Sequence, residues 1–212
     1  YQHGADLYHF DLKKSKTSKI EIDYSTPRAQ TQLKFVPTSR YLDHYSISSD
    51  GSSLGVISRG KAFTFGDWEG PVTQHGAKQG VRYRLITWLP GDEEVIVVSD
   101  EGGEDHLEIH NVKGEKKPII FNKIDIGRPN WLEVSPKGGY VCVVNHRHEL
   151  LLVDLKKSTS KVIDQSKYAP IHGFNWSPDG AWVVYATTAN PRQVILKIYN
   201  LKTGKIEDLT DP

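Results

Sequence analysis

The sequence has few of the features that mark disulfide-bonded, membrane or metal-binding proteins. Its 212 residues include one cysteine and no methionine, and no apolar run approaches the roughly 20 residues that span a bilayer. The single cysteine, Cys142, excludes a disulfide within the chain and any metal site built on a cysteine pair. With 27 basic and 26 acidic residues the formal net charge is +1, so we expect neither nucleic acid nor a membrane as a partner.

The start of the chain is typical of the middle of a protein. No secretory signal pattern is present, and methionine is missing even at position 1. We therefore expect a piece excised or processed from a longer protein.

A repeat organises the chain. Four segments share a polar turn with glycine followed by an apolar run, and their starts are 41, 46 and 42 residues apart. These segments are 48–51, 89–92, 135–138 and 177–180. A period of about 40–45 residues with several short strands is typical of β-propeller blades. In the last unit the predicted strands are 174–176, 182–186, 195–199 and 205–209.

The second strand of each unit is continuously apolar rather than alternating. The second strands are predicted at 54–57, 95–98 and 141–144, and the third strands at 62–65, 107–110 and 150–153. Continuous apolar strands indicate cover on both faces, as between stacked blades. Trp88, Trp131 and Trp176 recur at or near the first strand, and we expect them in the core.

The sequence therefore predicts an all-β fold, a β-propeller segment with four complete four-stranded blades and a half blade. The half blade has a third strand at 7–12 and a fourth at 19–22, with no strand before them. We expect a fragment of a six- or seven-bladed ring; the alternative is a four-bladed ring with an extra hairpin. The predicted segment is 1–212, with the half blade at 1–30 and blades at about 31–80, 81–125, 126–167 and 168–212.

No catalytic or cofactor motif appears in the sequence. A hydrolase serine is normally presented in Gly-x-Ser-x-Gly, which is absent, and Ser177 belongs to a repeated blade turn. Gly102-Gly103 opens no helix and so forms no phosphate cradle. The acidic stretch 100–105 lacks the residue order of a calcium loop and is predicted to be a solvated hairpin. We expect no catalytic residue and no cofactor.

Histidine is frequent, with nine copies. His146 and His148 alternate on a strand or hairpin and so share a face, whereas His106 and His110 are four residues apart on a predicted strand. Metal sites usually need three or four ligands with supporting hydrogen bonds. We therefore expect these histidines to be solvated loop or hairpin residues, with no metal site.

Four arginines, Arg82, Arg84, Arg128 and Arg147, are dispersed along the chain. Equivalent loops of different blades gather at one face or in the central channel of a propeller. Arg128 precedes a first strand, where it could bind a carboxylate or remain a surface cation. The candidate channel or peptide contacts are Arg128, His146 and Arg147.

The most specific motif of the chain is Asn-His-Arg-x-Glu-Leu-Leu-Leu-Val-Asp-Leu at 145–155, and further characteristic stretches lie at 63–71, 107–110, 125–128 and 173–180. Through these stretches the sequence resembles tricorn-type proteases over nearly the whole chain. The match is to the interior of the larger, seven-bladed propeller in the N-terminal region of that family. One departure is 89–92, where the blades of the family tend to read Ser-Pro-Asp-Gly.

The resemblance implies a large, oligomeric, cytoplasmic serine peptidase that processes oligopeptides. In that family two propellers precede a catalytic region with a PDZ-like module, and the propellers gate substrate entry and product exit. No position here matches the catalytic motifs, so no catalytic residue is assigned. The implied partners are oligopeptide substrates, the remaining blades and catalytic domains of the longer chain, and further copies in a homo-oligomer.

Two other functions are compatible with the propeller repeat alone, since propellers host many functions. One is a protein-interaction scaffold without peptidase activity, as in TolB-like or WD-repeat proteins. The other is the propeller lid of a prolyl-oligopeptidase-like hydrolase. The specific match at 145–155 favours a noncatalytic segment that gates or channels oligopeptides to a catalytic region outside the chain.

Overall fold

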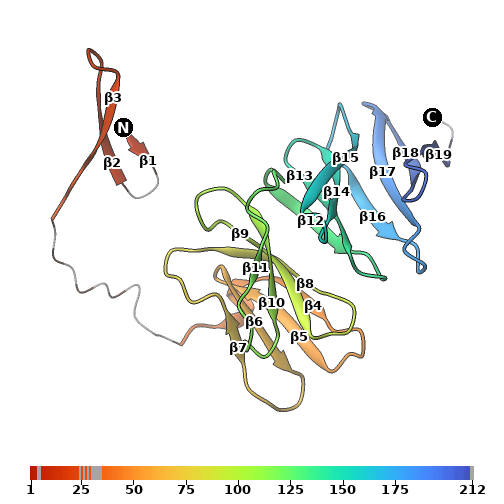
Figure 1. Cartoon of the computed structure of the whole chain (residues 1–212), viewed down its shortest axis with the longest axis horizontal. Helices are drawn as coiled ribbons and strands as arrows, with labels where there is room; N and C mark the ends of the chain where they lie inside the picture. The colour runs from red at the N-terminus through yellow and green to blue at the C-terminus, as the bar shows by residue number, and fades with distance from the viewer. Residues whose placement is uncertain (4–5, 24, 26, 28, 30–34, 211–212) are drawn as a thin grey trace. The chain divides into compact units, whose positions relative to one another are not determined.

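Antiparallel β-strands supply nearly all of the regular secondary structure in the computed structural model, which describes residues 1–3, 6–23, 25, 27, 29 and 35–210 (Figure 1). The helix in this part of the chain, α1 (Thr38–Tyr41), has four residues. The chain divides into two compact units, Tyr1–Pro37 and Thr38–Pro212. Residues 31–34, where the first complete blade is predicted to begin, lie outside the described residues, as do 211–212.

The first unit is a three-stranded sheet in the order β1-β2-β3. Its strands are β1 (Gln2–His3), β2 (Asp6–Asp11) and β3 (Lys16–Ile20). β2 and β3 are the two strands that the sequence predicts here. The prediction that no strand precedes them is wrong, because β1 pairs with β2. A two-residue strand is too short to show an alternating pattern, so β1 has no recognisable pattern in the sequence.

The second unit contains four four-stranded antiparallel sheets, each formed by four consecutive strands. The first sheet comprises β4 (Leu42–Ile47), β5 (Ser53–Ser58), β6 (Lys61–Gly66) and β7 (Thr73–His75). The second comprises β8 (Tyr83–Trp88), β9 (Glu94–Ser99), β10 (His106–Asn111) and β11 (Ile119–Ile120). The third comprises β12 (Pro129–Val134), β13 (Tyr140–Asn145), β14 (Glu149–Asp154) and β15 (Thr159–Gln165). The fourth comprises β16 (His172–Trp176), β17 (Trp182–Asn190), β18 (Gln193–Asn200) and β19 (Ile206–Asp208), so the predicted propeller blades are confirmed.

The core lies between successive sheets, which follow one another in chain order in Figure 1. Ile96 and Val98 of β9 share one buried cluster with Val141 and Val143 of β13. Further clusters join the first sheet to the second and the third to the fourth. The second strands β9 and β13 are therefore covered on both faces, as predicted, whereas β5 contributes Ile57 to a cluster with the second sheet only. β-branched residues suit such buried strands.

In the first and fourth blades the repeated turn is held by a serine and an aspartate. Ser48 Oγ donates to Asp50 Oδ1 at 2.7 Å and accepts from the Ser53 backbone N–H at 2.9 Å. The second blade has Leu89 in place of the serine. Its Asp92 instead accepts the Ser49 backbone N–H from the neighbouring sheet at 3.0 Å, so this departure from the repeat becomes a link between blades.

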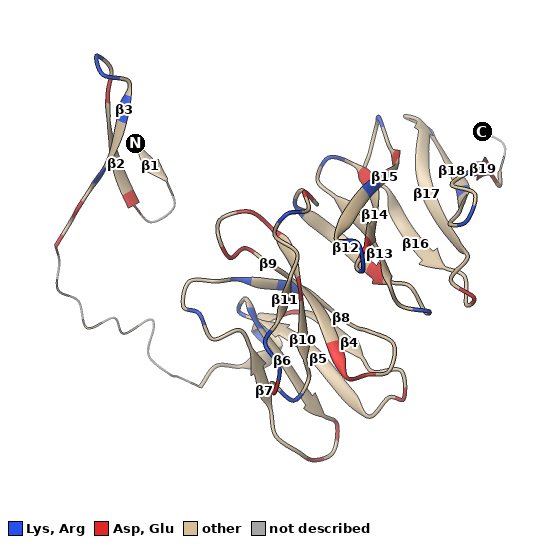
Figure 2. Cartoon of the chain, in the orientation of Figure 1, with Lys and Arg blue, Asp and Glu red and all other residues tan. Residues whose placement is uncertain are grey.

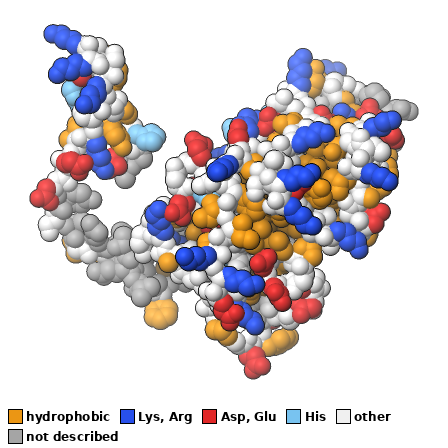
Figure 3. Space-filling view, viewed as in Figure 1, with side chains coloured by type: hydrophobic (Ala, Val, Ile, Leu, Met, Phe, Trp, Pro, Cys, Tyr) orange, Lys and Arg blue, Asp and Glu red, His pale blue; other side chains and the backbone are white. Residues whose placement is uncertain are grey.

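The recurring tryptophans do not share one environment. Trp88 is buried and donates its ring N–H to the Ser46 carbonyl of the preceding blade at 3.0 Å. Trp131 is 48% exposed, so the prediction that it packs in the core is wrong. It lies near the start of its strand, three residues before the position that Trp88 and Trp176 occupy. Figure 3 shows that hydrophobic surface is also open to solvent elsewhere on this unit.

Candidate functional site

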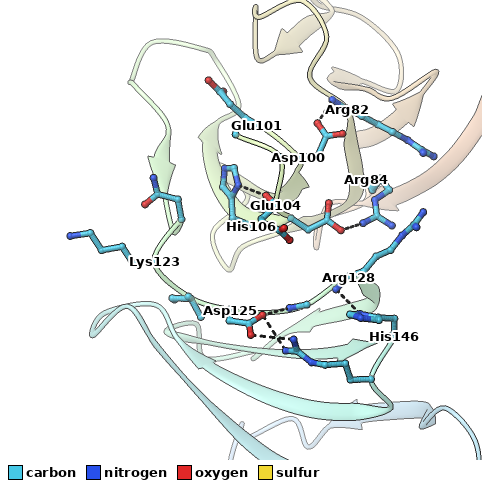
Figure 4. A pocket seen from close by; sticks show the side chains of 17 residues that line it. Arg82, Arg84, Asp100, Glu101, Glu104, His106, Lys123, Asp125, Arg128 and His146 are labelled. Atoms are coloured by element: carbon cyan, nitrogen blue, oxygen red, sulfur yellow. Dashed lines mark hydrogen bonds and ion pairs between the residues drawn. The ribbon is translucent and has the colours of Figure 1, made fainter. Parts of the chain in front are cut away.

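A cavity of about 1310 Å³ lies where one end of the second sheet meets the same end of the third. Three groups of residues line it: Arg82 and Arg84 at the start of β8, the loop 100–105 between β9 and β10, and the connection 122–128 that leads into β12. His106 and the β13–β14 turn complete the wall (Figure 4). Segments that are far apart in the sequence are thus brought together by the repeat.

The three predicted contacts, Arg128, His146 and Arg147, all line this cavity. Two reciprocal hydrogen bonds of 2.9 Å join the first two: the Arg128 backbone N–H donates to His146 Nδ1, and the His146 backbone N–H donates to the Arg128 carbonyl. Because His146 Nδ1 accepts a hydrogen bond, a neutral ring carries its proton on Nε2. The structure brings these residues together, and their role as peptide contacts remains a prediction.

Arg147 is held by two carboxylates. Its terminal nitrogens donate to both oxygens of Asp125 at 3.1 Å, and its Nε donates to Glu149 at 2.9 Å. These hydrogen bonds raise the pKa of Arg147, and the guanidinium and the Gly127 N–H hold the pKa of Asp125 below its usual range. Buried Asn145 ties the same loop down by donating to the Ile126 carbonyl at 3.1 Å. Arg147 therefore acts mainly to fix the loop before β12.

Arg82 and Arg128 occupy the same position in successive blades, each seven residues before the first residue of the repeated turn. The main chain of Arg82 is fixed like that of Arg128: its N–H donates to Asp100 Oδ1 at 2.7 Å, and its carbonyl accepts the Asp100 N–H at 3.2 Å. Both side chains are exposed. No hydrogen bond or ion pair engages either guanidinium within the described part of the chain.

Arg84 links the two blades at the mouth of the cavity. It donates to Asp105 in a short ion pair and to the Pro129 carbonyl at 3.4 Å. Pro129 directly follows Arg128, so Arg84 brings the second blade to the start of the third. Two of the four arginines belong to the second blade and two to the third, and the structure brings all four to one cavity.

The acidic loop 100–105, red in Figure 2, forms the facing wall. Residues 102–104 are exposed, which fits the predicted hairpin. The other carboxylates in it have local partners: Asp100 accepts the Arg82 N–H, Glu101 pairs with Lys78 at 2.6 Å, and Asp105 pairs with Arg84. The loop is therefore only partly solvated: Glu101 and Asp105 are paired with cations, whereas Asp100 and Glu104 have no cationic partner among the described residues.

Two histidines of β10 are buried rather than solvated, so that part of the histidine prediction is wrong. His106 Nε2 lies 3.0 Å from one oxygen of Glu108, and His110 Nε2 lies 2.8 Å from the other. The exposed fractions of the three residues are 5%, 6% and 1%. Alternate residues of a strand face the same side, so His-x-Glu-x-His placed on a buried strand was the available signal.

Burial alone raises the pKa of Glu108, but hydrogen bonds from His110 and Ser99 and the charges of both histidines outweigh it. The net result is a pKa below the ordinary value for glutamate, so Glu108 is ionised. A third histidine, His75 of β7, packs on His110 with ring centroids 5.4 Å apart and bonds Thr64 Oγ1 at 2.8 Å. His106 thus connects the cavity wall to a buried polar row across two blades.

No group of three or more His, Cys, Asp or Glu side chains in the described part of the chain is arranged to hold a metal ion. None of the helical segments in that part is long and apolar enough to cross a membrane.

Comparison with known proteins places this chain among the tricorn proteases. The family model of the tricorn protease second beta propeller domain matches residues 42–212. A tricorn protease homolog of Saccharolobus solfataricus is 34% identical over the whole chain, which spans 19% of that relative. The tricorn protease of Thermoplasma volcanium is 28% identical over 98% of the chain, which spans 20% of it.

The solved structures agree in fold. The crystal structure of the tricorn protease superposes with a TM-score of 0.76 at 23% identity, covering 97% of this chain and 20% of that one. TolB from Acinetobacter baumannii, a propeller of one alternative class, gives a TM-score of 0.60 at 16% identity, over 95% of this chain and 47% of that one. At these identities the structural likeness shows the fold alone. Because the family model covers most of its residues, the chain belongs to the tricorn protease family and contains part of the second beta propeller domain of that family.

Proposed function

We propose that this chain is a noncatalytic propeller segment that channels oligopeptides toward a catalytic serine-peptidase region elsewhere in a longer protein. The observation that carries the proposal is the polar cavity between two blades, with the unpaired guanidiniums of Arg82 and Arg128 at its edge. Peptides present carboxylates and carbonyls, which guanidinium groups bind well.

Membership of the family supports the rest of the proposal. The four sheets would be blades of a six- or seven-bladed ring, completed by further parts of the same protein. The chain spans only about a fifth of the curated relatives, which leaves room in such a protein for a catalytic region. We propose that the whole protein assembles as a homo-oligomer in the cytoplasm, as the resemblance implies.

Obstructing the cavity in the full-length protein tests the proposal. Glu104→Cys places a thiol on the exposed part of the acidic loop, where a maleimide-linked polymer can be attached. The native Cys142 is buried, and burial raises the pKa of its thiol, so it competes poorly for the reagent. We expect the polymer to slow cleavage of an oligopeptide of about ten residues several-fold, with less effect on a small fluorogenic substrate.

Lys156→Cys provides the matched control. Lys156 is an exposed residue of the β14–β15 turn, at the end of the third sheet opposite the β13–β14 turn. Polymer on Lys156→Cys should leave both rates unchanged. If polymer on Glu104→Cys also leaves oligopeptide cleavage unchanged, this end of the blades is no peptide path, and the scaffold interpretation gains support.

A further inference from the structure

Arg82 and Arg128 are repeat-equivalent, and the structure treats them alike. In each case the main chain of the arginine exchanges two hydrogen bonds with the residue eighteen positions later, Asp100 or His146. Hydrogen bonds within the same blade thereby fix the backbone of each arginine, and the guanidinium group remains unbound. The stem of Arg82 is further restricted by Gly60, because a Cβ on that glycine would lie 2.8 Å from Arg82 Cγ.

Arg84 places a third guanidinium beside them. It spans from Asp105 of the second blade to the carbonyl that follows Arg128 in the third. Figure 4 shows Arg82, Arg84 and Arg128 extending toward the same side of the cavity. One of these three cations has a carboxylate partner, and the guanidiniums of the other two have none among the described residues, so two guanidiniums remain free to bind an anion.

We propose that Arg82 and Arg128, with Arg84 between the two blades, form a subsite that binds a carboxylate of the oligopeptide. The inference rests on the proposed function, which supplies the peptide. A planar guanidinium presents paired N–H donors that match the two oxygens of a carboxylate. Among the acidic groups on the same cavity, Asp105 is paired with Arg84, Asp100 accepts a backbone N–H, and Glu104 is exposed. The free N–H donors that an incoming carboxylate meets are those of Arg82 and Arg128.

The carboxylate could be the C-terminus of the peptide or an acidic side chain, and matched peptides separate these sources. We would use four octapeptides of one neutral sequence, each labelled with an uncharged fluorophore such as BODIPY: with a free C-terminal acid, with a C-terminal amide, and each of these with one internal glutamine replaced by glutamate. Binding to the full-length protein is followed by fluorescence anisotropy, with catalysis blocked by a serine-directed covalent inhibitor.

The double variant Arg82→Gln/Arg128→Gln should weaken binding of the acid peptides roughly tenfold to a hundredfold, the range expected for lost charge-assisted hydrogen bonds. Binding of the neutral amide should not change. The double variant Arg82→Lys/Arg128→Lys keeps both positive charges but removes the planar pairs of N–H donors. It should therefore give an intermediate loss of affinity for the acid peptides. Arg192→Gln, an exposed arginine of the β17–β18 hairpin, is the matched control and should behave as wild type.

Two results would overturn the subsite. One is a double variant that binds every peptide as wild type does; the other is one that loses the neutral amide and the acids equally. A loss confined to the C-terminal acids assigns the terminus, and one confined to the glutamate peptides assigns the side chain. If polymer at Glu104→Cys still slows oligopeptide cleavage while the double variant keeps wild-type selectivity, the channel stands and only the carboxylate subsite fails.

Discussion

Glu108 in β10 and Leu151 in β14 occupy equivalent positions of neighbouring blades, three residues before the polar residue that ends each third strand. Both are almost fully buried, with exposed fractions of 1% and 2%. Leu151 packs in an apolar cluster that also contains Val143 and Leu107. Glu108 instead lies between His106 and His110, which bond its two oxygens.

The comparison shows that the same buried strand position can hold either an apolar side chain or a hydrogen-bonded carboxylate. The contributions of these two side chains to stability depend on different conditions. Burying a leucine contributes about 1.5–3 kcal/mol and needs only close neighbours. A buried carboxylate must lose its hydration, and only well-placed hydrogen bonds offset that loss. The β14 position should therefore resist changes of pH but not an introduced charge, whereas the β10 position should depend on its partners and on pH.

The largest effect should come from placing the charge of β10 into the surroundings of β14. Leu151→Glu would bury a carboxylate without a histidine partner, so we expect the free energy of unfolding to fall by about 4 kcal/mol or more. Urea unfolding followed by tryptophan fluorescence measures this. Ser160→Glu, at an exposed position of β15, should change stability by less than about 0.5 kcal/mol. Equal effects of the two variants would contradict the comparison.

Removing the carboxylate from β10 should have the next largest effect. Glu108→Ala leaves two buried histidines without their acceptor and opens a cavity, so we expect a loss of about 3–5 kcal/mol in the same urea experiment. Glu108→Gln keeps the shape and one acceptor oxygen, so its loss should be smaller. Equal losses for the two variants would mean that packing, rather than charge, holds this position.

Lowering the pH should weaken the β10 row through His75 first. Burial, helped by the neighbouring His110, lowers the pKa of His75 from 6.5 to about 4. The unfolded chain therefore takes up a proton that the folded chain does not, and stability falls as the pH drops from 6.5 toward 4, by about 3 kcal/mol. Glu108, whose pKa is lowered, loses its stabilising charge in a further window below its ordinary value of 4.5.

Urea midpoints measured between pH 8 and pH 4 check this order of events. His75→Leu should flatten the curve between pH 6.5 and 4 while leaving the loss from Glu108 at lower pH. A wild-type midpoint that does not change over the upper window would show that His75 is protonated as easily when folded as when unfolded.

The blades could be predicted well from the sequence because each repeat contains residues with strong local preferences for a turn or for a buried strand. The turn at 177–180 joins proline, aspartate and glycine, and the run at 141–144 has no polar residue, so turn and buried strand are both visible locally. Strand β1 was missed because two residues carry no period. Trp131 was misplaced because its distance from the turn, rather than its residue type, decides its exposure.

The candidate site was predictable only in part. The position of Arg128 before a first strand indicated the right end of the blade, and the reciprocal bonds to His146 brought a second candidate with it. The sequence could not show that the guanidinium of Arg147 is hydrogen-bonded to Asp125 and Glu149, whereas the guanidinium of Arg82 has no such partner among the described residues. That distinction depends in part on the contact between Arg147 and Asp125, which lie 22 positions apart and meet only in the folded chain.

The smallest effect should come from making β10 resemble β14. The triple variant His106→Leu/Glu108→Leu/His110→Val replaces the polar row with apolar side chains, and replacing a whole buried ionic group in this way is often neutral or stabilising. We expect its free energy of unfolding at pH 7 to lie within about 1 kcal/mol of the wild-type value. The loss of stability below pH 4.5 that Glu108 causes should disappear in the same titration. If the triple variant is instead as unstable as Glu108→Ala, then the polar row supplies packing that leucine and valine cannot reproduce, and third strands of neighbouring blades are not interchangeable.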